Sequence, residues 1–257
     1  DSGTQSISEL DVKDSNASGG QALVCNSCSN TGNNTNWIFP ITGKVYSDAG
    51  SQAVGAGHTV AVSVNGGTPT TATTDSSGNF SLSKVISAGD VVAVYLTGTT
   101  NEDGAIVTVS DGNASAYTYN IYQDHLIVRN ENGGSLTNAN LATAASVGDT
   151  QLAELFGVSG GALTMGTDKT LLVPSGHTFA PGGTVNAANV TVQGTFTMGT
   201  NAVNVARSWN STSGTFTGTN TVTFTGSGTI RKGSSNFSTL VFNALNGKWT
   251  PVSSLAT

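Results

Sequence analysis

Short runs of alternating valine and threonine, separated by glycine and asparagine, recur along most of this chain. Successive side chains of a β-strand point to opposite faces and β-branched residues favour strands, so each run indicates a strand. The intervening glycines and asparagines are typical of turns. Long helices are excluded because the residues that favour them are scarce: only 9 Lys+Arg and 15 Asp+Glu occur among 257 residues. The sequence therefore predicts an all-β protein.

The composition also excludes several classes of function. No apolar run approaches the roughly 20 residues that a membrane-spanning helix needs. A net charge of −6 with a pI of about 4.8 argues against nucleic-acid binding, which requires clustered lysine and arginine. A low-charge chain rich in Thr and Gly is typical of extracellular proteins, so we expect a location outside the cell or on its surface. The start at Asp1, without a methionine, is expected of a mature secreted chain and equally of a piece of a longer one.

The only two cysteines form a C-x-x-C motif at Cys25 and Cys28. A zinc site would need two more ligands, and the three histidines are scattered without ligand spacing. A thioredoxin-like redox site would need a βαβ context, which the pattern lacks. We therefore expect a local structural disulfide, with free thiols and a metal or redox site as the alternatives.

Seven N-x-S/T triplets make candidate glycosylation acceptors, although many triplets arise by chance in a chain so rich in Asn, Ser and Thr. They are Asn16, Asn33, Asn79, Asn113, Asn189, Asn210 and Asn236.

Residues 1–36 are rich in Ser, Asn and Gly and carry only two short apolar stretches. Such a segment buries too little apolar surface to order itself, so its own chain or a neighbour must hold it. We expect an extended N-terminal segment that adds a strand to the open edge of a neighbouring subunit. The candidate side chains for this donor strand are Ile7, Leu10, Val12, Leu23 and Val24.

Residues 37–125 are expected to form a compact β-sandwich, because strand patterns alternate with turn signals every 8–12 residues or so. The predicted strands span residues 43–46, 59–64, 70–73, 79–82, 91–96, 105–109 and 116–122. The sequence Gly43-Lys44-Val45-Tyr46 and the later Thr-Asp-x-x-Gly-x-Phe motif over residues 74–80 resemble the bacterial Ig-like, carboxypeptidase-regulatory-like module. This resemblance implies an Ig-like sandwich that acts as a spacer in surface proteins.

Residues 126–165 are a predicted junction with one or two short helices, since residues 138–156 contain the only stretch of helical character. Residues 166–257 are expected to form a second β-domain of short strands divided by Gly and Asn, either a β-solenoid or a second sandwich. Two phrases, Gly194-Thr195-Phe196-Thr197 and Gly214-Thr215-Phe216-Thr217, are similar to each other. They resemble the strands of large repetitive prokaryotic surface proteins. Their threonines also resemble ice-binding arrays, but ordinary strand propensity is the favoured interpretation.

Charge is distributed unevenly along the chain. Residues 1–168 hold all 15 acidic residues, whereas residues 169–257 hold none and carry five of the nine cations. The formal net charge is therefore −11 for residues 1–168 and +5 for residues 169–257. Unlike ends favour head-to-tail contacts, and such contacts generate a filament when they do not close into a ring.

The motifs of common active sites are missing. The sequence contains no G-x-S-x-G, H-E-x-x-H or P-loop pattern. The acid-free final third lacks the paired carboxylates that a glycosidase needs. We expect no cofactor; the turns at 75–79, 102–104 and 111–113 are candidate calcium sites, with ordinary turn chemistry as the alternative. Lys44 and Asn120 are the one candidate pair for an isopeptide bond.

Together these patterns favour a non-enzymatic extracellular structural protein, whose partners are copies of itself in a filament or surface layer. The alternative is an adhesin or carbohydrate-binding module of a larger surface protein, with surface glycans as partners. That alternative would give a role to exposed tryptophans, although tryptophans are more often core anchors. The candidates are Trp37, Trp209 and Trp249.

Overall fold

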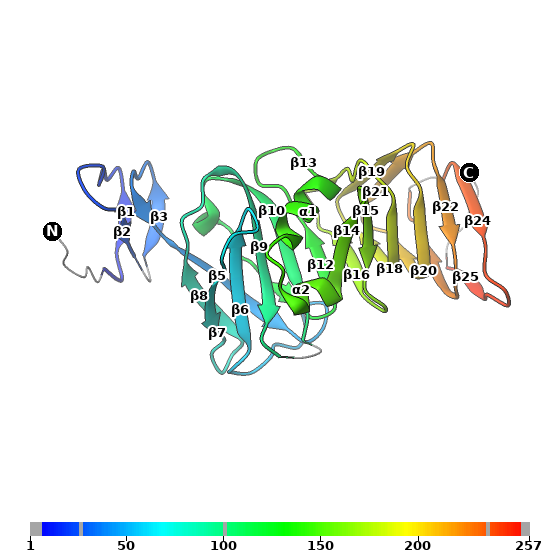
Figure 1. Cartoon of the computed structure of the whole chain (residues 1–257), viewed down its shortest axis with the longest axis horizontal. Coiled ribbons are helices and arrows are strands. Elements are labelled where there is room, and N and C mark those ends of the chain that lie inside the picture. The colour runs from blue at the N-terminus through cyan, green and yellow to red at the C-terminus, as the bar shows by residue number, and fades with distance from the viewer. Residues whose placement is uncertain (1–6, 26–27, 100–101, 235–236, 253–257) are drawn as a thin grey trace.

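The computed structural model describes residues 7–25, 28–99, 102–234 and 237–252. These residues build an elongated molecule whose parts follow one another from the N-terminus at one end to the C-terminus at the other (Figure 1). Strands dominate, and the described residues contain only two short α-helices. The predicted all-β class is therefore confirmed.

The first part is a small unit of parallel strand pairs. Its strands are β1 (Asp11–Lys13), β2 (Leu23–Val24), β3 (Ser29–Gly32) and β4 (Trp37–Ile38). β1 pairs with β3 and β2 with β4, in parallel, so the chain makes a full turn between partners. Cys25 and Cys28 lie in its small core with Val12 and Phe39. The N-terminal segment was expected to be extended; in the structure it coils and pairs with itself.

The second part contains two sheets that face each other. The outer sheet has the order β11 (Ile121–Tyr122), β5 (Pro40–Tyr46), β8 (Asn79–Ser83). The inner one comprises β7 (Thr70–Thr73), β6 (Thr59–Val64), β9 (Ala88–Thr97) and β10 (Ala105–Asp111), all paired antiparallel. Val60, Val62 and Val94 fill the core between the sheets. The arrangement does not by itself establish the Ig-like module.

The inner sheet is buried on both faces. Larger and smaller apolar residues alternate along its strands, and an alternating pattern predicts that one face of a sheet is in contact with solvent. In the structure the second face, which carries Ala61, Ala93 and Tyr95, packs into another core that continues through the rest of the molecule. On this face the small side chains of Ala61 and Ala93 leave room for the helices of the junction.

The junction supplies those helices. α1 (Asn138–Ala145) starts at a capping box between Thr137 and Asn140, and α2 (Thr150–Leu155) starts where Asp149 accepts two backbone N–H bonds. Both helices pack against β9. The remaining elements of this region are the 3-10 turn η1 (Ala114–Ala116), β12 (His125–Val128), β13 (Ser135–Leu136), β14 (Phe156–Ser159) and β15 (Ala162–Met165).

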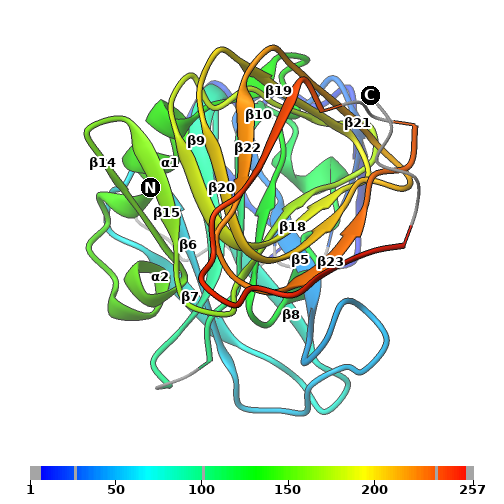
Figure 2. The ribbon, with the colours of Figure 1, turned by 90° about the vertical axis from the view of Figure 1, so that its right-hand side faces the viewer.

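The third part is a β-solenoid, which decides between the two predicted alternatives. Its strands are β16 (Thr170–Val173), β17 (Thr178–Phe179), β18 (Val185–Val192), β19 (Thr195–Gly199), β20 (Val203–Asn210), β21 (Thr215–Gly218), β22 (Thr221–Phe224), β23 (Gly228–Arg231), β24 (Thr239–Phe242) and β25 (Trp249–Pro251). The chain winds around one axis, as Figure 2 shows end-on. From β15 onwards each next parallel partner follows after one turn of 17–22 residues, for example Thr178 and Thr195, or Leu163 and Val185. The earlier pairs β12–β16 and β13–β17 are 43–45 residues apart, because the helices lie between their strands.

Three faces enclose the solenoid core. Face 1 comprises β10, β12, β16, the second halves of β18 and β20, then β23 and β25. Face 2 comprises β13, β17, β19 and β21. Face 3 comprises β15, the first halves of β18 and β20, then β22 and β24. On face 2 the two Gly-Thr-Phe-Thr phrases stack in register, Phe196 on Phe216.

Aromatic side chains fill the solenoid interior. Phe179, Phe196 and Phe216 form a ladder with ring centroids 5.2 and 5.4 Å apart, and Trp209 packs edge-on against Phe216 at 4.8 Å. Glycine makes the sharp turn from face 1 to face 2 in each rung: a Cβ on Gly194 would lie 2.3 Å from the carbonyl oxygens of Pro174 and His177.

Face 1 joins the second part to the third without a linker. Pairing changes from antiparallel to parallel at β10, because this strand pairs with β9 on one side and with β12 on the other. Inward residues stack in register along this face: Tyr95, Ala105, Leu126, Leu171, Val190, Trp209 and Ile230. Each of them is at most 1% exposed, so one hydrophobic core spans both parts.

Tyr95 provides a test of this shared core. Its hydroxyl is buried without a hydrogen-bond partner in the described part of the chain, and burial raises its pKa from about 10 to about 12. Unfolded Tyr95 therefore loses its proton first, and the free energy of unfolding falls between these pH values. We expect Tyr95→Phe to add about 1 kcal/mol at pH 7 and to reduce the alkaline slope by about 1.4 kcal/mol per pH unit. Urea titrations from pH 7 to 12 check both; an unchanged slope would contradict the buried position.

Candidate functional site

A groove lies where the outer sheet of the second part ends and face 1 of the solenoid becomes exposed. Its floor is an outward ladder of face 1, in which Ile106, Ile127, Leu172 and Thr191 stack in register. The cavity has a volume of about 290 Å³. Ligand sites often form where two parts of a protein meet, so this groove is the best candidate for a binding site.

Polar side chains surround this apolar floor. On the side of the outer sheet, the lining is Thr118, Asn120 and Tyr122; on the solenoid side, it is His125, Arg129, His177, Thr191 and Gln193. Ala49, Ile106, Ile127, Leu172 and Pro174 supply the apolar part. The lining holds no carboxylate, so the groove has no acid–base pair of the kind that glycoside hydrolysis uses.

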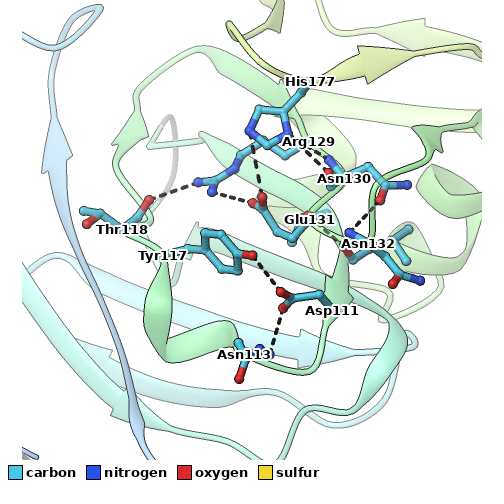
Figure 3. Close-up of polar contacts among 11 residues, drawn as sticks. Asp111, Asn113, Tyr117, Thr118, Arg129, Asn130, Glu131, Asn132 and His177 are labelled. Atoms are coloured by element: carbon cyan, nitrogen blue, oxygen red, sulfur yellow. Dashed lines mark hydrogen bonds and ion pairs between the residues drawn. The ribbon is translucent and has the colours of Figure 1, made fainter. Parts of the chain in front are cut away.

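A buried ion pair holds the two sides of the groove together (Figure 3). Arg129 follows β12 and pairs with Glu131, and the two side chains are only 12% and 4% exposed. Arg129 Nη1 also donates to the carbonyl oxygen of Thr118 at 3.0 Å. The guanidinium therefore connects face 1 to the chain that enters β11.

The guanidinium also lies beside two tyrosine rings. Its carbon is 5.8 Å from the ring centroid of Tyr117 and 5.3 Å from that of Tyr119, within the range of cation–π attraction. The Tyr117 hydroxyl donates to Asp111 at 2.7 Å, and this bond, with burial, raises the pKa of Tyr117 to about 12. Burial raises the pKa of Tyr119 still further. Both phenols are therefore neutral at physiological pH, and among the described residues that of Tyr117 donates a hydrogen bond whereas that of Tyr119 has no partner.

His177 brings the solenoid into this network. Its Nε2 lies 3.9 Å from Glu131 Oε2, and its Nδ1 lies 3.3 Å from the backbone nitrogen of Asn130. Glu131 thus faces Arg129 on one side and His177 on the other, as the sticks in Figure 3 show. The network fixes the rear of the groove and pairs its charged groups with one another.

A second buried ionic cluster lies beside face 1. Lys169 Nζ contacts Asp103 at 2.8 Å and Asp124 at 2.6 Å, and the Asp103 side chain is only 1% exposed. Burial raises the pKa of Asp103, and the two carboxylates raise that of Lys169. The cluster ties the loop before β10 to the turn before β16, so it stabilises the junction.

The sequence-predicted site residues are dispersed over the molecule. Cys25 and Cys28 are joined in a disulfide with their Cα atoms 5.6 Å apart. Of the donor-strand residues, Ile7 forms a bridge with Cys25 and Val12 pairs through β1 with β3, both within residues 1–36. Leu23 and Val24 pair through β2 with β4, which follows that segment. Leu10 is 49% exposed.

The glycosylation acceptors differ in exposure. Asn16, Asn33, Asn79 and Asn113 are exposed, whereas Asn189 and Asn210 are partly buried and their side chains bond the chain itself. Asn236 lies outside the described residues.

Other candidates take local roles. Asp75 and Asp111 accept bonds from backbone N–H groups two residues on, as turn residues do. Asn120 Oδ1 accepts from the backbone nitrogen of Lys44 at 3.2 Å, while Lys44 Nζ lies over the Tyr46 ring. The described part of the chain holds no group of three His, Cys, Asp or Glu side chains placed to bind a metal ion.

The three tryptophans all pack against other aromatic side chains, and Trp37 and Trp249 remain partly exposed. Trp209 is fully buried, and Trp249 packs at 4.6 Å against Phe224. Trp37 stacks on Phe39 at 6.0 Å in the first part. Sequence reasoning missed Arg129, Glu131 and His177; the only signal for them was two opposite charges two positions apart in a chain with so few.

Comparison with protein-family models, curated proteins and solved structures finds no match for this chain. Neither helix among the described residues is long and apolar enough to span a membrane.

Removing one member of the Arg129–Glu131 pair should cost more than removing both. Arg129→Met leaves a buried carboxylate without its cation, and such losses cost about 3–5 kcal/mol. The double variant Arg129→Met/Glu131→Gln removes both charges, so it should be less destabilised than Arg129→Met alone. Urea unfolding of the single and double variants measures this coupling; strictly additive losses would show that the pair does not interact.

Lys169→Met should destabilise the protein in a pH-dependent manner. Asp103 then remains buried without its cation, and we expect a loss of about 3–5 kcal/mol at pH 7 relative to the wild type. A buried carboxyl with a raised pKa stabilises the folded state as it takes up a proton, so this difference should shrink as the pH falls towards 4. A difference in the free energy of unfolding that stays constant with pH would contradict this role of Lys169.

Proposed function

We propose that this chain is a non-enzymatic structural protein of an extracellular filament or surface layer, in which copies join head-to-tail. The observation that carries this proposal is the single core and the single sheet that run from β7 to β24 through both β-parts. The second and third parts share this sheet and this core, so they bend little relative to each other, because any hinge between them would have to break ladder hydrogen bonds and expose apolar surface. Such a molecule is suited to be a rigid spacer, the role that the Ig-like resemblance implies.

Assembly through the N-terminal segment is the second element of the proposal. β2 pairs with β4, and the bridge between Ile7 and Cys25 lies directly after it. Within the described residues, β1 has a strand partner on one side only, β3, so its other edge is open. β24 is likewise paired on one side only, with β22. Open strand edges favour pairing with another chain. The segment would add its strand in parallel, which is the pairing that it already uses and that the solenoid continues.

The opposite charges at the two ends of the molecule and the exposed apolar side chains at its C-terminal end support head-to-tail assembly. Asp11 and Asp14 are exposed on the N-terminal segment, whereas Lys248 and Arg231 are exposed near the last described rungs. Several apolar side chains are exposed at those same rungs: Val241, Phe242, Leu245 and Val252. An acidic strand that covers a basic, partly apolar edge would bury this surface and pair opposite charges.

The test is deletion of residues 1–36. We expect the intact protein to form end-to-end polymers at high concentration, less readily as salt screens the opposite charges, and the truncated protein to remain monomeric. Light scattering and negative-stain microscopy measure both. The control is Glu154→Gln, which removes one exposed charge outside the segment and should still polymerise.

Two outcomes contradict different parts of the proposal. Polymers formed by the truncated protein would rule out assembly through the N-terminal segment. An intact protein that stays monomeric at every concentration and salt would rule out the filament itself.

A further inference from the structure

The floor of the groove changes from apolar to polar along one ladder of face 1. Ile106, Ile127 and Leu172 are nearly buried, and the next residue in register is the hydroxyl-bearing Thr191. The change occurs where the cover of the outer sheet ends. The groove thus offers a flat, aliphatic strip beside a hydroxyl, with Tyr122 at its side.

Several polar side chains on its rim have unused hydrogen-bonding atoms. Across the described residues, the side chains of Gln193, Thr191 and Thr118 make no hydrogen bond, and Asn120 uses only its oxygen, for the backbone of Lys44. These atoms come from both sides of the groove. A ligand in the groove can therefore meet amide donors, amide acceptors and hydroxyls at once.

His125 adds an oriented acceptor. Its Nδ1 lies 2.7 Å from the carbonyl oxygen of Gln123, and because a carbonyl only accepts, Nδ1 carries the proton. In the neutral ring Nε2 is therefore an acceptor. Tyr122 packs edge-on against this ring at 5.9 Å and holds its orientation.

Because the rim offers no free charged group, an ionic ligand is not the best fit for this groove. Arg129 is the one permanent charge in the lining; its guanidinium pairs with Glu131 and donates to the carbonyl of Thr118, and its Nε is buried without a partner among the described residues. An aliphatic floor with neutral donors and acceptors around it matches a sugar ring, which has an apolar face of C–H groups and a rim of hydroxyls. A cavity of about 290 Å³ is at the small end of ligand sites, the size for one ring.

We propose that this groove binds one neutral pyranose unit of a saccharide. The ring would lie on Ile127 and Leu172, with its hydroxyls bonded to Thr191, Gln193 and His125. This inference is independent of polymer formation, since the groove lies on the side of face 1 and not at a strand edge. It makes the chain a structural protein that also holds glycan.

A second groove on the solenoid supplies control residues. It is lined by Asn186, Asn204, Thr223 and Asn243, among others. Asn204 donates to Asn186 at 2.7 Å, and Arg207 at its edge pairs with Asp168. The side chains of Thr223 and Asn243 make no hydrogen bond among the described residues, as in the first groove, but alanines lie beside them in place of Ile127 and Leu172, so they serve as matched controls.

The experiment titrates the full chain with neutral probes: glucose, galactose, mannose and N-acetylglucosamine, and a β-linked tetrasaccharide of glucose and of N-acetylglucosamine. Saturation-transfer NMR detects binding and calorimetry measures Kd. We expect at least one probe to bind, and Gln193→Ala and Thr191→Val each to weaken it about tenfold, as the loss of one hydrogen bond does. The matched variants Asn243→Ala and Thr223→Val, in the second groove, should bind as the wild type does.

The altered side chains are not buried, and Thr191→Val keeps its shape, so all four variants should retain the wild-type Tm. No binding by any neutral probe would overturn the proposal. So would equal losses in the variants of the two grooves, or, when glucuronate is titrated as a charged comparison, tighter binding of glucuronate than of glucose. If the chain fails to polymerise yet binds a probe with this pattern, the glycan site stands and the filament does not.

Discussion

Strand pairing along face 1 is the constraint on which the rest of the molecule depends. β10 completes an antiparallel sheet with β9 and starts a parallel stack with β12. The hydrogen bonds on its two edges therefore belong to two architectures, and the inward ladder from Tyr95 to Ile230 gives both the same core. The solenoid needs no separate cap at this end, because the antiparallel sheet covers its first rung. The ionic cluster of Lys169 and the helices α1 and α2 reinforce the same junction.

The candidate site follows from this junction. The outer sheet covers face 1 only over its first rungs, so the outward ladder is aliphatic under the cover and polar beyond it, from Leu172 to Thr191. Arg129 and Glu131, which are buried and paired with each other, lie between the aliphatic and the polar region of this ladder. A groove with an apolar floor and unpaired polar atoms is the result. The geometry positions donors and acceptors and offers no carboxylate in the lining, which suits binding more than hydrolysis.

Strands were predictable from the sequence because alternation is local. The run 59–64 forms β6, and Asn65 and Gly66 after it adopt positive φ, as a tight turn requires. The two Gly-Thr-Phe-Thr phrases indicated stacked rungs, but the variable rung length and the inserted helices hid the repeat elsewhere. Parallel pairing between β12 and β16 joins residues far apart in the chain, and no local pattern encodes it. The groove was unpredictable for the same reason: Asn120, Arg129 and His177 meet only through that pairing.

The antiparallel and solenoid parts share one core. Hydrogen exchange in rising urea tests it most directly, because it reports the opening free energy of each strand. The account predicts that β9, β10, β12 and β16 open together with one free energy and one dependence on urea. Exchange of β16 while β9 and β10 remain protected would contradict it, since the solenoid would then be a separate unit joined to the sandwich only by the chain.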